Sequence, residues 1–292
     1  MSTHAGTLFV IATPIGNMDD ISARARDTLG KVDLVAAEDT RRAGQLLTRL
    51  GIRNRLVSLH EQNETERAEE IIEDLLSGRD VALISDAGTP LVSDPGYRLL
   101  AEVRRQDLPV SPIPGPCAAI AALSIAGLPS DRFLFEGFLP AKGSGRRRRL
   151  AVLAHLQATV VLYESVHRIK DLLADIEQVL DRDRQITVAR ELTKLHETIH
   201  RGTVGEVREL LDEDPGGEKG EFTIVISGDP EPPDVERAEL ERVLGILLQD
   251  VSAKQAARLA AEITGARHNQ AYRLASELRD GGSQEESPDQ SP

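Results

Sequence analysis

Short apolar runs alternate with longer segments of helical pattern in the first part of the chain. Glu64–Ser77 carries apolar residues at the spacing of one helical face. Because strand and helix alternate, we expect crossover connections, a largely parallel sheet and ligand-binding loops at the carboxyl ends of the strands. The pattern predicts an α/β protein with buried strands at Leu8–Ala12, Leu34–Ala37, Val81–Ser85 and Val110–Ile113.

The alternation resumes further along the chain and then gives way to helical pattern alone. Strands are predicted at Phe133–Gly137, Thr159–Tyr163, Ile186–Glu191 and Phe222–Ser227, and helices near His167–Leu180, Val204–Leu211, Leu240–Leu248, Ala253–Ile263 and Asn269–Leu278. We therefore expect an N-terminal α/β lobe (1–114), a C-terminal α/β lobe (115–228), a linker (229–236), a helix-turn-helix-like region (237–280) and a disordered acidic tail (281–292).

Composition narrows the class of protein. Aromatic residues make up only 3% of the chain and Trp is absent, so the core must be built from Val, Ile, Leu and Ala. The single cysteine, Cys117, excludes an intramolecular disulfide and a cysteine-based zinc ribbon, and it suits a reducing compartment. No apolar run reaches the roughly 18 residues that span a bilayer, so we expect a cytoplasmic protein without membrane association.

Charge argues against one mode of nucleic-acid binding. The formal net charge of −13 disfavours a protein that coats nucleic acid through charge alone, because nonspecific affinity comes from neutralising phosphates. Any contact with nucleic acid must therefore come from a local patch.

The segment His196–His200 matches the zinc-protease pattern, in which two histidines one helical turn apart bind a metal. Its surroundings, Leu195–Thr203, mix β-branched residues with charge and predict a strand instead. In a strand, positions four apart are separated by about 13 Å, which one zinc ion cannot bridge. No metal is expected.

Three loops that follow predicted strands are rich in Gly and Pro. Gly permits close approach of the backbone to a ligand, although each loop alone could be an ordinary tight turn. No phosphate-binding or dinucleotide-binding glycine motif follows any strand. The three loops are Ala12–Asn17, Ser85–Gly96 and Ile113–Pro116.

These loops belong to a set of segments that carry a family resemblance over roughly residues 7–228. The segments are ATPIGN (12–17), AEDTR (37–41), HEQN (60–63), SDAGTPLVSDPG (85–96), PIPGP (112–116), YES (163–165), RELTKLHE (190–197) and GEF (220–222). The chain resembles the ribosomal RNA small-subunit methyltransferase I family, the cytidine 2′-O-methyltransferases of the tetrapyrrole methylase superfamily. It departs from the family pattern at Cys117, where Ser is usual, and at Val166, where Pro is usual.

The resemblance implies a two-lobed tetrapyrrole-methylase-like fold, that of the class III S-adenosylmethionine (SAM) methyltransferases, with a small C-terminal helical appendage. It implies SAM in the cleft between the lobes, a homodimer, and methylation of a cytidine ribose 2′-hydroxyl in 16S ribosomal RNA, within the small ribosomal subunit. Carried over from the family, the cofactor neighbours are Pro14, Asp86, Ala87, Gly88, Thr89, Val92, Ser93, Pro114, Cys117, Ala118 and Tyr163.

Methyl transfer to a ribose oxygen is an in-line displacement that depends on positioning and gains from a nearby base or cation. If the strand ending near Glu191 alternates, Glu191 and Lys194 lie on opposite faces, and only a bend near Thr193 lets both reach the acceptor. Lys194 could act as a neutral base or as a charged stabiliser of the alkoxide, and both roles stay open. The residues expected on the acceptor side are Glu38, Asp39, Arg41, Glu191 and Lys194.

Other features carry two interpretations each. Arg146–Arg149, preceded by a Gly- and Ser-containing segment, is either a solvated loop or a mobile arm that contacts phosphate. His167 and Arg168 either touch RNA or pack at a helix start, and the C-terminal helices either bind RNA or serve packing or dimerisation.

Two rival functions remain at this stage. One is a methyltransferase of the same fold that acts on a tetrapyrrole or another small molecule. The other is a ribosome-assembly factor that binds RNA without catalysis. The sequence leaves open whether free RNA or an assembled subunit is the substrate.

Overall fold

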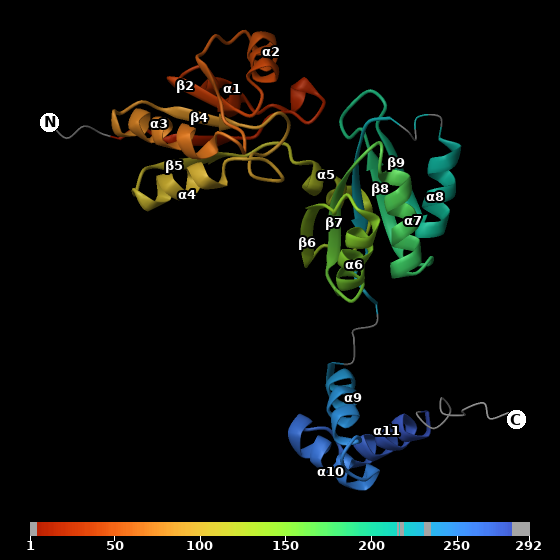
Figure 1. Cartoon of the computed structure of the whole chain (residues 1–292). Helices are drawn as coiled ribbons and strands as arrows, with labels where there is room; N and C mark the ends of the chain where they lie inside the picture. The colour runs from red at the N-terminus through yellow and green to blue at the C-terminus, as the bar shows by residue number, and fades with distance from the viewer. Residues whose placement is uncertain (1–4, 215, 217–218, 231–234, 282–292) are drawn as a thin grey trace, which may run out of the picture. The chain divides into compact units, whose positions relative to one another are not determined.

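The computed structural model describes residues 5–214, 216, 219–230 and 235–281 of the 292-residue chain. Two compact units divide it, Met1–Gly228 and Asp229–Pro292, and the first contains two lobes, each built on its own five-stranded sheet (Figure 1). Among the described residues, every helix is too short or too polar to traverse a bilayer.

The first lobe is a parallel sheet in the order β3-β2-β4-β1-β5. Its strands are β1 (Leu8–Ile11), β2 (Leu34–Ala37), β3 (Leu56–Ser58), β4 (Val81–Ile84) and β5 (Val110–Ile113). Its helices are α1 (Ala23–Leu29), α2 (Thr40–Leu50), α3 (Glu64–Leu76) and α4 (Tyr97–Arg105), with a 3₁₀ turn at Met18–Asp20. The predicted parallel sheet is confirmed, and its four predicted strands correspond to β1, β2, β4 and β5. The three-residue strand β3 was not predicted, because it is too short to give a recognisable pattern.

The central strands β2 and β4 are buried along their whole length. Their side chains enter two separate clusters, one on each face of the sheet: Leu34 lies in one and Val35 in the other. A parallel sheet covered on both faces needs apolar residues at every position, which is why these strands read as unbroken apolar runs.

The second lobe is a mixed sheet in the order β6-β7-β10-β8-β9, in which only β6 and β7 are parallel. Its strands are β6 (Phe133–Phe138), β7 (Thr159–Ser165), β8 (Gln185–Arg190), β9 (Thr198–Thr203) and β10 (Glu221–Ile226). Its helices are α5 (Ala118–Ala126), α6 (Gly143–Leu153), α7 (Ile169–Leu180) and α8 (Val204–Glu213). The strand predicted over Leu195–Thr203 is confirmed for Thr198–Thr203, which includes His200, whereas Leu195 and His196 lie in the preceding turn. Neither histidine is on the helix that a zinc-protease motif needs.

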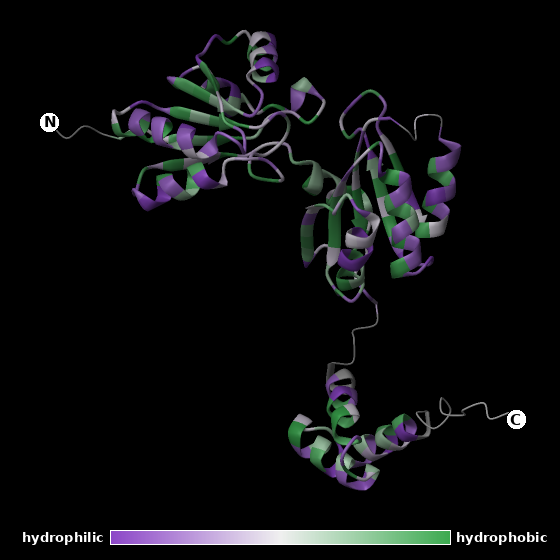
Figure 2. Ribbon diagram, viewed as in Figure 1, coloured by the Kyte–Doolittle hydropathy of each residue, from purple (hydrophilic) through white to green (hydrophobic). Residues whose placement is uncertain are grey.

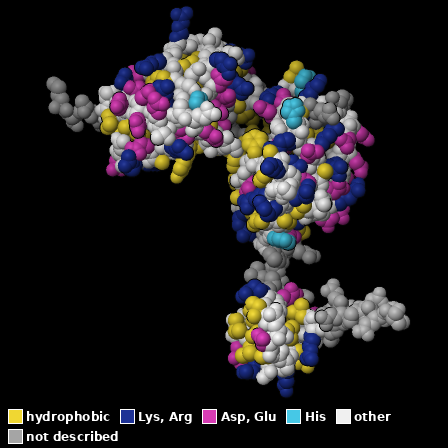
Figure 3. Space-filling model, in the orientation of Figure 1, with side chains coloured by type: hydrophobic (Ala, Val, Ile, Leu, Met, Phe, Trp, Pro, Cys, Tyr) yellow, Lys and Arg dark blue, Asp and Glu magenta, His cyan; other side chains and the backbone are white. Residues whose placement is uncertain are grey.

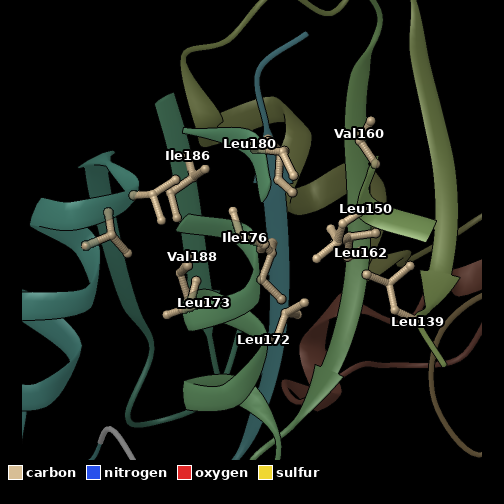
Figure 4. Close-up of a cluster of buried hydrophobic side chains, with 14 of the residues drawn as sticks. Leu139, Leu150, Val160, Leu162, Leu172, Leu173, Ile176, Leu180, Ile186 and Val188 are labelled. Atoms are coloured by element: carbon tan, nitrogen blue, oxygen red, sulfur yellow. The ribbon is translucent and has the colours of Figure 1, made fainter. Parts of the chain in front are cut away.

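One face of this second sheet carries the largest core cluster. Figure 4 shows Leu172, Leu173 and Ile176 of α7 directed toward the strands, with Leu150 of α6 beside β7. Figure 2 shows the matching pattern, in which the strands are coloured mostly apolar and the helices carry polar outer faces. The other face is covered by the apolar helix α5.

The arginine run is not the loop or mobile arm that the sequence suggested. Arg146–Arg149 lie inside α6, and Arg146 is 5% exposed, with its Nε 2.6 Å from Asp175 Oδ2 of α7. Arg147 also pairs with Asp175 (2.9 Å), and Arg149 pairs with Glu136. Three of the four arginines therefore pair with acidic residues of the same lobe, and one of them, Arg146, is buried.

Arg168, at the start of α7, also turns inward. It donates to the carbonyl oxygen of Leu139 (2.7 Å) and pairs with Glu164. These contacts favour the packing interpretation for this residue.

The C-terminal unit is all-helical, with α9 (Val235–Leu247), α10 (Ala253–Thr264) and α11 (His268–Gly281). Ser252 caps α10 through its side chain, and Gly265 ends that helix in the left-handed conformation (φ 76°). Ala256, Ala260 and Ala271 are fully buried in this unit's own core. Positions 231–234 of the expected linker and 282–292 of the expected acidic tail lie outside the described residues.

Candidate active site

A cavity of about 380 Å³ lies between the two lobes of the first unit. The first lobe contributes the loops that follow β1, β2 and β4, where parallel strands present their carboxyl ends. The second lobe contributes the start of α5, parts of β6, β7, β8 and β10, and the turn after β8.

The loop after β4 forms the first-lobe wall of the cavity. Gly88 has a φ of 87° and pairs with Thr13 through backbone hydrogen bonds. A Cβ on Gly88 would meet Ile15 Cγ2 at 3.2 Å, so both the conformation and the space favour glycine here. Thr89 Oγ1 donates to the carbonyl oxygen of Pro116 (2.9 Å), which ties this loop to the segment before α5.

The opposite wall centres on Tyr163 of β7. Its hydroxyl accepts a hydrogen bond from the backbone N–H of Ala119 in the first turn of α5 (3.0 Å). Burial raises the Tyr163 pKa well above its usual range, so the phenol stays protonated and neutral. Cys117 is the N-cap residue of α5 but makes no side-chain capping bond.

Three carboxylates make the first-lobe side of the cavity acidic: Glu38, Asp86 and Asp94. Burial, and then the charges of Glu38 and Asp86, raise the pKa of Asp94 to about 6, against a hydrogen bond from Ser85 that lowers it. Burial and the charge of Asp86 also raise the Glu38 pKa. The only ion pair recorded for this trio is Arg42 Nη1 to Asp86 Oδ2 (3.1 Å) among the residues described.

A tight turn after β8 brings Glu191 and Lys194 together. Glu191 and Thr193 both have positive φ (53° and 64°), and Lys194 Nζ lies 2.7 Å from Glu191 Oε1 and 2.9 Å from Glu221 Oε2. Burial lowers the Lys194 pKa, but hydrogen bonds to the two carboxylates outweigh it and the net pKa is raised. The bend that would let both residues reach one site is present, and it leaves Lys194 charged.

Most of the residues predicted from sequence line this cavity. On the cofactor side these are Asp86, Ala87, Gly88, Thr89, Val92, Ser93, Cys117, Ala118 and Tyr163, and on the acceptor side Glu38, Glu191 and Lys194. Pro14, Pro114, Asp39 and Arg41 are not among the lining residues. Asp39 instead caps α2, accepting from the Arg41 backbone N–H (2.8 Å), and its carboxylate also pairs with the Arg41 guanidinium.

Comparison with known proteins shows which family has this fold and this sequence. The family model for tetrapyrrole (corrin/porphyrin) methylases matches residues 7–208, and the model for the RsmI C-terminal HTH domain matches residues 234–279. The chain is 48% identical over 272 residues to the ribosomal RNA small subunit methyltransferase I of Escherichia coli O157:H7, covering 93% of this chain and 95% of the relative. It is 50% identical over 273 residues to the protein of that name from Pseudomonas aeruginosa, covering 93% and 97%. The chain belongs to the ribosomal RNA small subunit methyltransferase I family of tetrapyrrole methylases.

Solved structures of other proteins share the fold at low sequence identity. Diphthine synthase matches with a TM-score of 0.58 and 17% identity, over 76% of this chain and 90% of that structure. Cobalt precorrin-4 methyltransferase matches with a TM-score of 0.54 and 17% identity, over 76% and 94%. Both likenesses support the two-lobed fold.

Sequence reasoning missed several cavity residues of this tetrapyrrole methylase. Asp94 lies in the segment SDAGTPLVSDPG and Glu221 in GEF, so both were inside matched motifs but were not singled out. Phe138 lines the cavity from β6, and no motif signalled it. Such side chains meet only when strands from both lobes come together.

Proposed function

We propose that this enzyme transfers a methyl group from SAM to the ribose 2′-hydroxyl of a cytidine in 16S ribosomal RNA. The observation that carries the proposal is the position of Lys194, a charged amine held by two carboxylates at the cavity between the lobes. The names of the relatives supply the substrate class, since they describe methyltransferases of small-subunit ribosomal RNA.

The cavity's residues fit SAM. A volume of about 380 Å³ lies in the range of small-molecule sites. Glu38, Asp86 and Asp94 suit a ligand that carries a sulfonium and an ammonium, and Ile15 and Val92 provide apolar wall. When bound, SAM supplies a methyl group already activated on its sulfonium. The protein's tasks are to bind SAM, to align the acceptor hydroxyl with the methyl group and to allow the hydroxyl proton to leave.

Lys194 acts in this proposal as a cation. Its raised pKa keeps the amine protonated near neutral pH, which disfavours the neutral-base role. A fixed positive charge next to the acceptor stabilises the negative charge that develops on the hydroxyl oxygen as it attacks and its proton passes to water. Glu191 and Glu221 orient the amine through hydrogen bonds of 2.7 and 2.9 Å.

The remaining organisation follows the family resemblance. We place the boundary between the lobes near residue 114 and propose a homodimer acting in the cytoplasm on small-subunit RNA, without a metal. The C-terminal unit is proposed as an accessory RNA-binding module.

Methyl transfer can be tested on small ribosomal subunits from cells that lack this gene. With labelled SAM, the wild-type enzyme should methylate one ribose in 16S RNA, and ribose-methylation mapping should lose that site in the deletion strain. Lys194→Met should cut single-turnover transfer at least about a hundredfold, the scale of losing a group that stabilises developing negative charge, with SAM affinity within about threefold. Lys194→Arg, which keeps the charge, should lose less. Label on a base, or on a small molecule and not on RNA, would overturn the proposal.

A further inference from the structure

Phe138 is an exposed aromatic side chain at the cavity. It is 56% exposed, whereas core residues of the same lobe such as Phe222 are almost fully buried. The centroid of its ring lies 5.8 Å from that of Tyr163 in an edge-on arrangement, and the Phe135 and Tyr163 centroids are 5.0 Å apart in the same kind of arrangement. In a chain with only five Phe and three Tyr, three of these rings gather here, and one of them faces solvent.

A β-bulge directs Phe138 to this face. Along β6, Phe135 pairs with Val161 and Phe138 with Tyr163, so Glu136 is the extra residue between them. Regular alternation would put residues 135 and 138 on opposite faces of the sheet. The bulge cancels that alternation and puts both phenylalanines on the face of Tyr163, as bulges beside active sites commonly re-aim a side chain.

A bidentate ion pair and a glycine stabilise the bulge. Arg149 of α6 donates hydrogen bonds to Glu136 from Nε and Nη2, at 2.6 and 2.8 Å. Gly137 has a φ of 70°, and a Cβ there would meet Ser93 Oγ of the first lobe at 2.8 Å. The bulge therefore requires glycine for its conformation and for the close approach of the two lobes. An exposed ring held in this way indicates a ligand-binding role rather than chance exposure.

We propose that Phe138 is the platform on which the target nucleobase stacks while its ribose enters the cavity. The inference rests on the proposed function, since it needs a nucleotide as acceptor. A nucleotide whose ribose enters a cavity between two lobes loses stacking on its neighbours in the strand, and an aromatic face can replace that stacking. Base–aromatic stacking is sequence-tolerant, so this contact would supply affinity and orientation, not the choice of base.

Paired variants separate stacking from simple apolar contact. Phe138→Leu keeps an apolar side chain without a ring, and it should lower kcat/KM for unmethylated small subunits about tenfold, in line with one lost base stack. Phe138→Tyr retains a ring and should stay within about threefold of wild type. SAM affinity by calorimetry should be unchanged in both, because the proposal assigns Phe138 to the acceptor.

Phe133 offers the matched control. It lies on β6 at the other end of the strand, is 42% exposed, and does not line the cavity. Phe133→Leu should leave kcat/KM for subunits unchanged.

Three results would overturn the proposal: wild-type kcat/KM in Phe138→Leu, an equal loss in Phe133→Leu, or a change of oligomeric state by light scattering in Phe138→Leu. The last would assign the ring to a subunit contact. Failure of the proposed function is separate, because wild-type enzyme would then label no ribose at all.

Discussion

The turn 191–194 shows how single residues set the chemistry of this site. Two non-glycine residues there have positive φ, a conformation that is uncommon and that clusters at functional sites. Thr193 holds the turn, since its Oγ1 accepts from the Asn17 backbone N–H (3.1 Å) and its own N–H donates to Glu197 (2.7 Å). The backbone thus fixes the position of Lys194 from both lobes.

Ionised Asp94 should lower the stability of the folded protein and raise its affinity for a cationic ligand. Its pKa of about 6 in the folded protein exceeds the ordinary value of 3.8, so the folded state binds the proton more tightly than the unfolded state. Stability then falls as pH rises from about 4 to about 6, and the full loss persists above that window. Asp94→Asn should therefore melt at a higher temperature than wild type at pH 8, and the difference should shrink as the pH falls from about 6 to about 4.

The same substitution should weaken SAM binding at pH 8, because the cavity in which we propose that the cationic cofactor binds loses one of its carboxylates. Wild-type affinity should itself fall as pH drops through about 6, where Asp94 takes up a proton. Asp27→Asn, at an exposed position of α1, is the control for both measurements. Equal melting temperatures of Asp94→Asn and wild type at pH 8 would show that the pKa of Asp94 is not raised in the folded protein.

At the scale of elements, α6 is held by charge as well as by apolar packing. Arg146 and Asp175 form an ion pair in which each side chain is less than a tenth exposed. The Asp175 pKa is lowered, because hydrogen bonds from Arg147 and Arg146 outweigh the effect of burial that raises it. Removing one partner of such a pair leaves the other charge buried without compensation, which destabilises the folded protein.

Arg146→Met should lower the free energy of unfolding by about 3 kcal/mol, since it leaves Asp175 buried with only Arg147 as an ion-pair partner. Arg148→Met, on the exposed side of the same helix, should change it by less than about 0.5 kcal/mol. Urea unfolding followed by circular dichroism measures both. Equal stability of the two variants would show that the ion pair contributes little to the packing of α6.

At the scale of the molecule, charge is dispersed over the first unit. Figure 3 shows basic and acidic side chains interspersed over its visible face, in keeping with the net charge of −13. The C-terminal unit differs at the start of α11, where exposed Arg267 and Arg273 flank a groove with Asn269 and Gln270. No ion pair is recorded for either arginine within the described part of the chain.

Replacing Arg267 and Arg273 with Gln should weaken binding of small subunits and flatten its salt dependence by roughly one unit of slope per lost phosphate contact. SAM affinity should not change, because every residue that lines the cavity lies in the first unit. Arg258→Gln, whose arginine already pairs with Glu262, is the control. An unaltered slope would leave the C-terminal helices with a packing or dimerisation role.

Much of the architecture is a local property of the sequence. Unbroken apolar runs such as Val81–Ile84 are unmistakable as covered parallel strands, and the glycine- and proline-rich loops after them mark the ligand-binding edge. The motif segments predicted the family, because several of them are long, consist of uncommon residues and occur in the same order as in the family. The strand at Thr198–Thr203 was also recognisable from its β-branched residues.

Tertiary structure decided what the charged and aromatic residues do. Four consecutive arginines look alike in sequence, yet Arg146 is buried because Asp175 of another helix faces it. Asp39 and Arg41 were expected at the acceptor but pair with each other at a helix start, while Asp94 and Phe138 line the cavity. The physical reason is that ionisation, pairing and exposure depend on groups distant in sequence, and a one-residue bulge in β6 suffices to choose which face a side chain occupies.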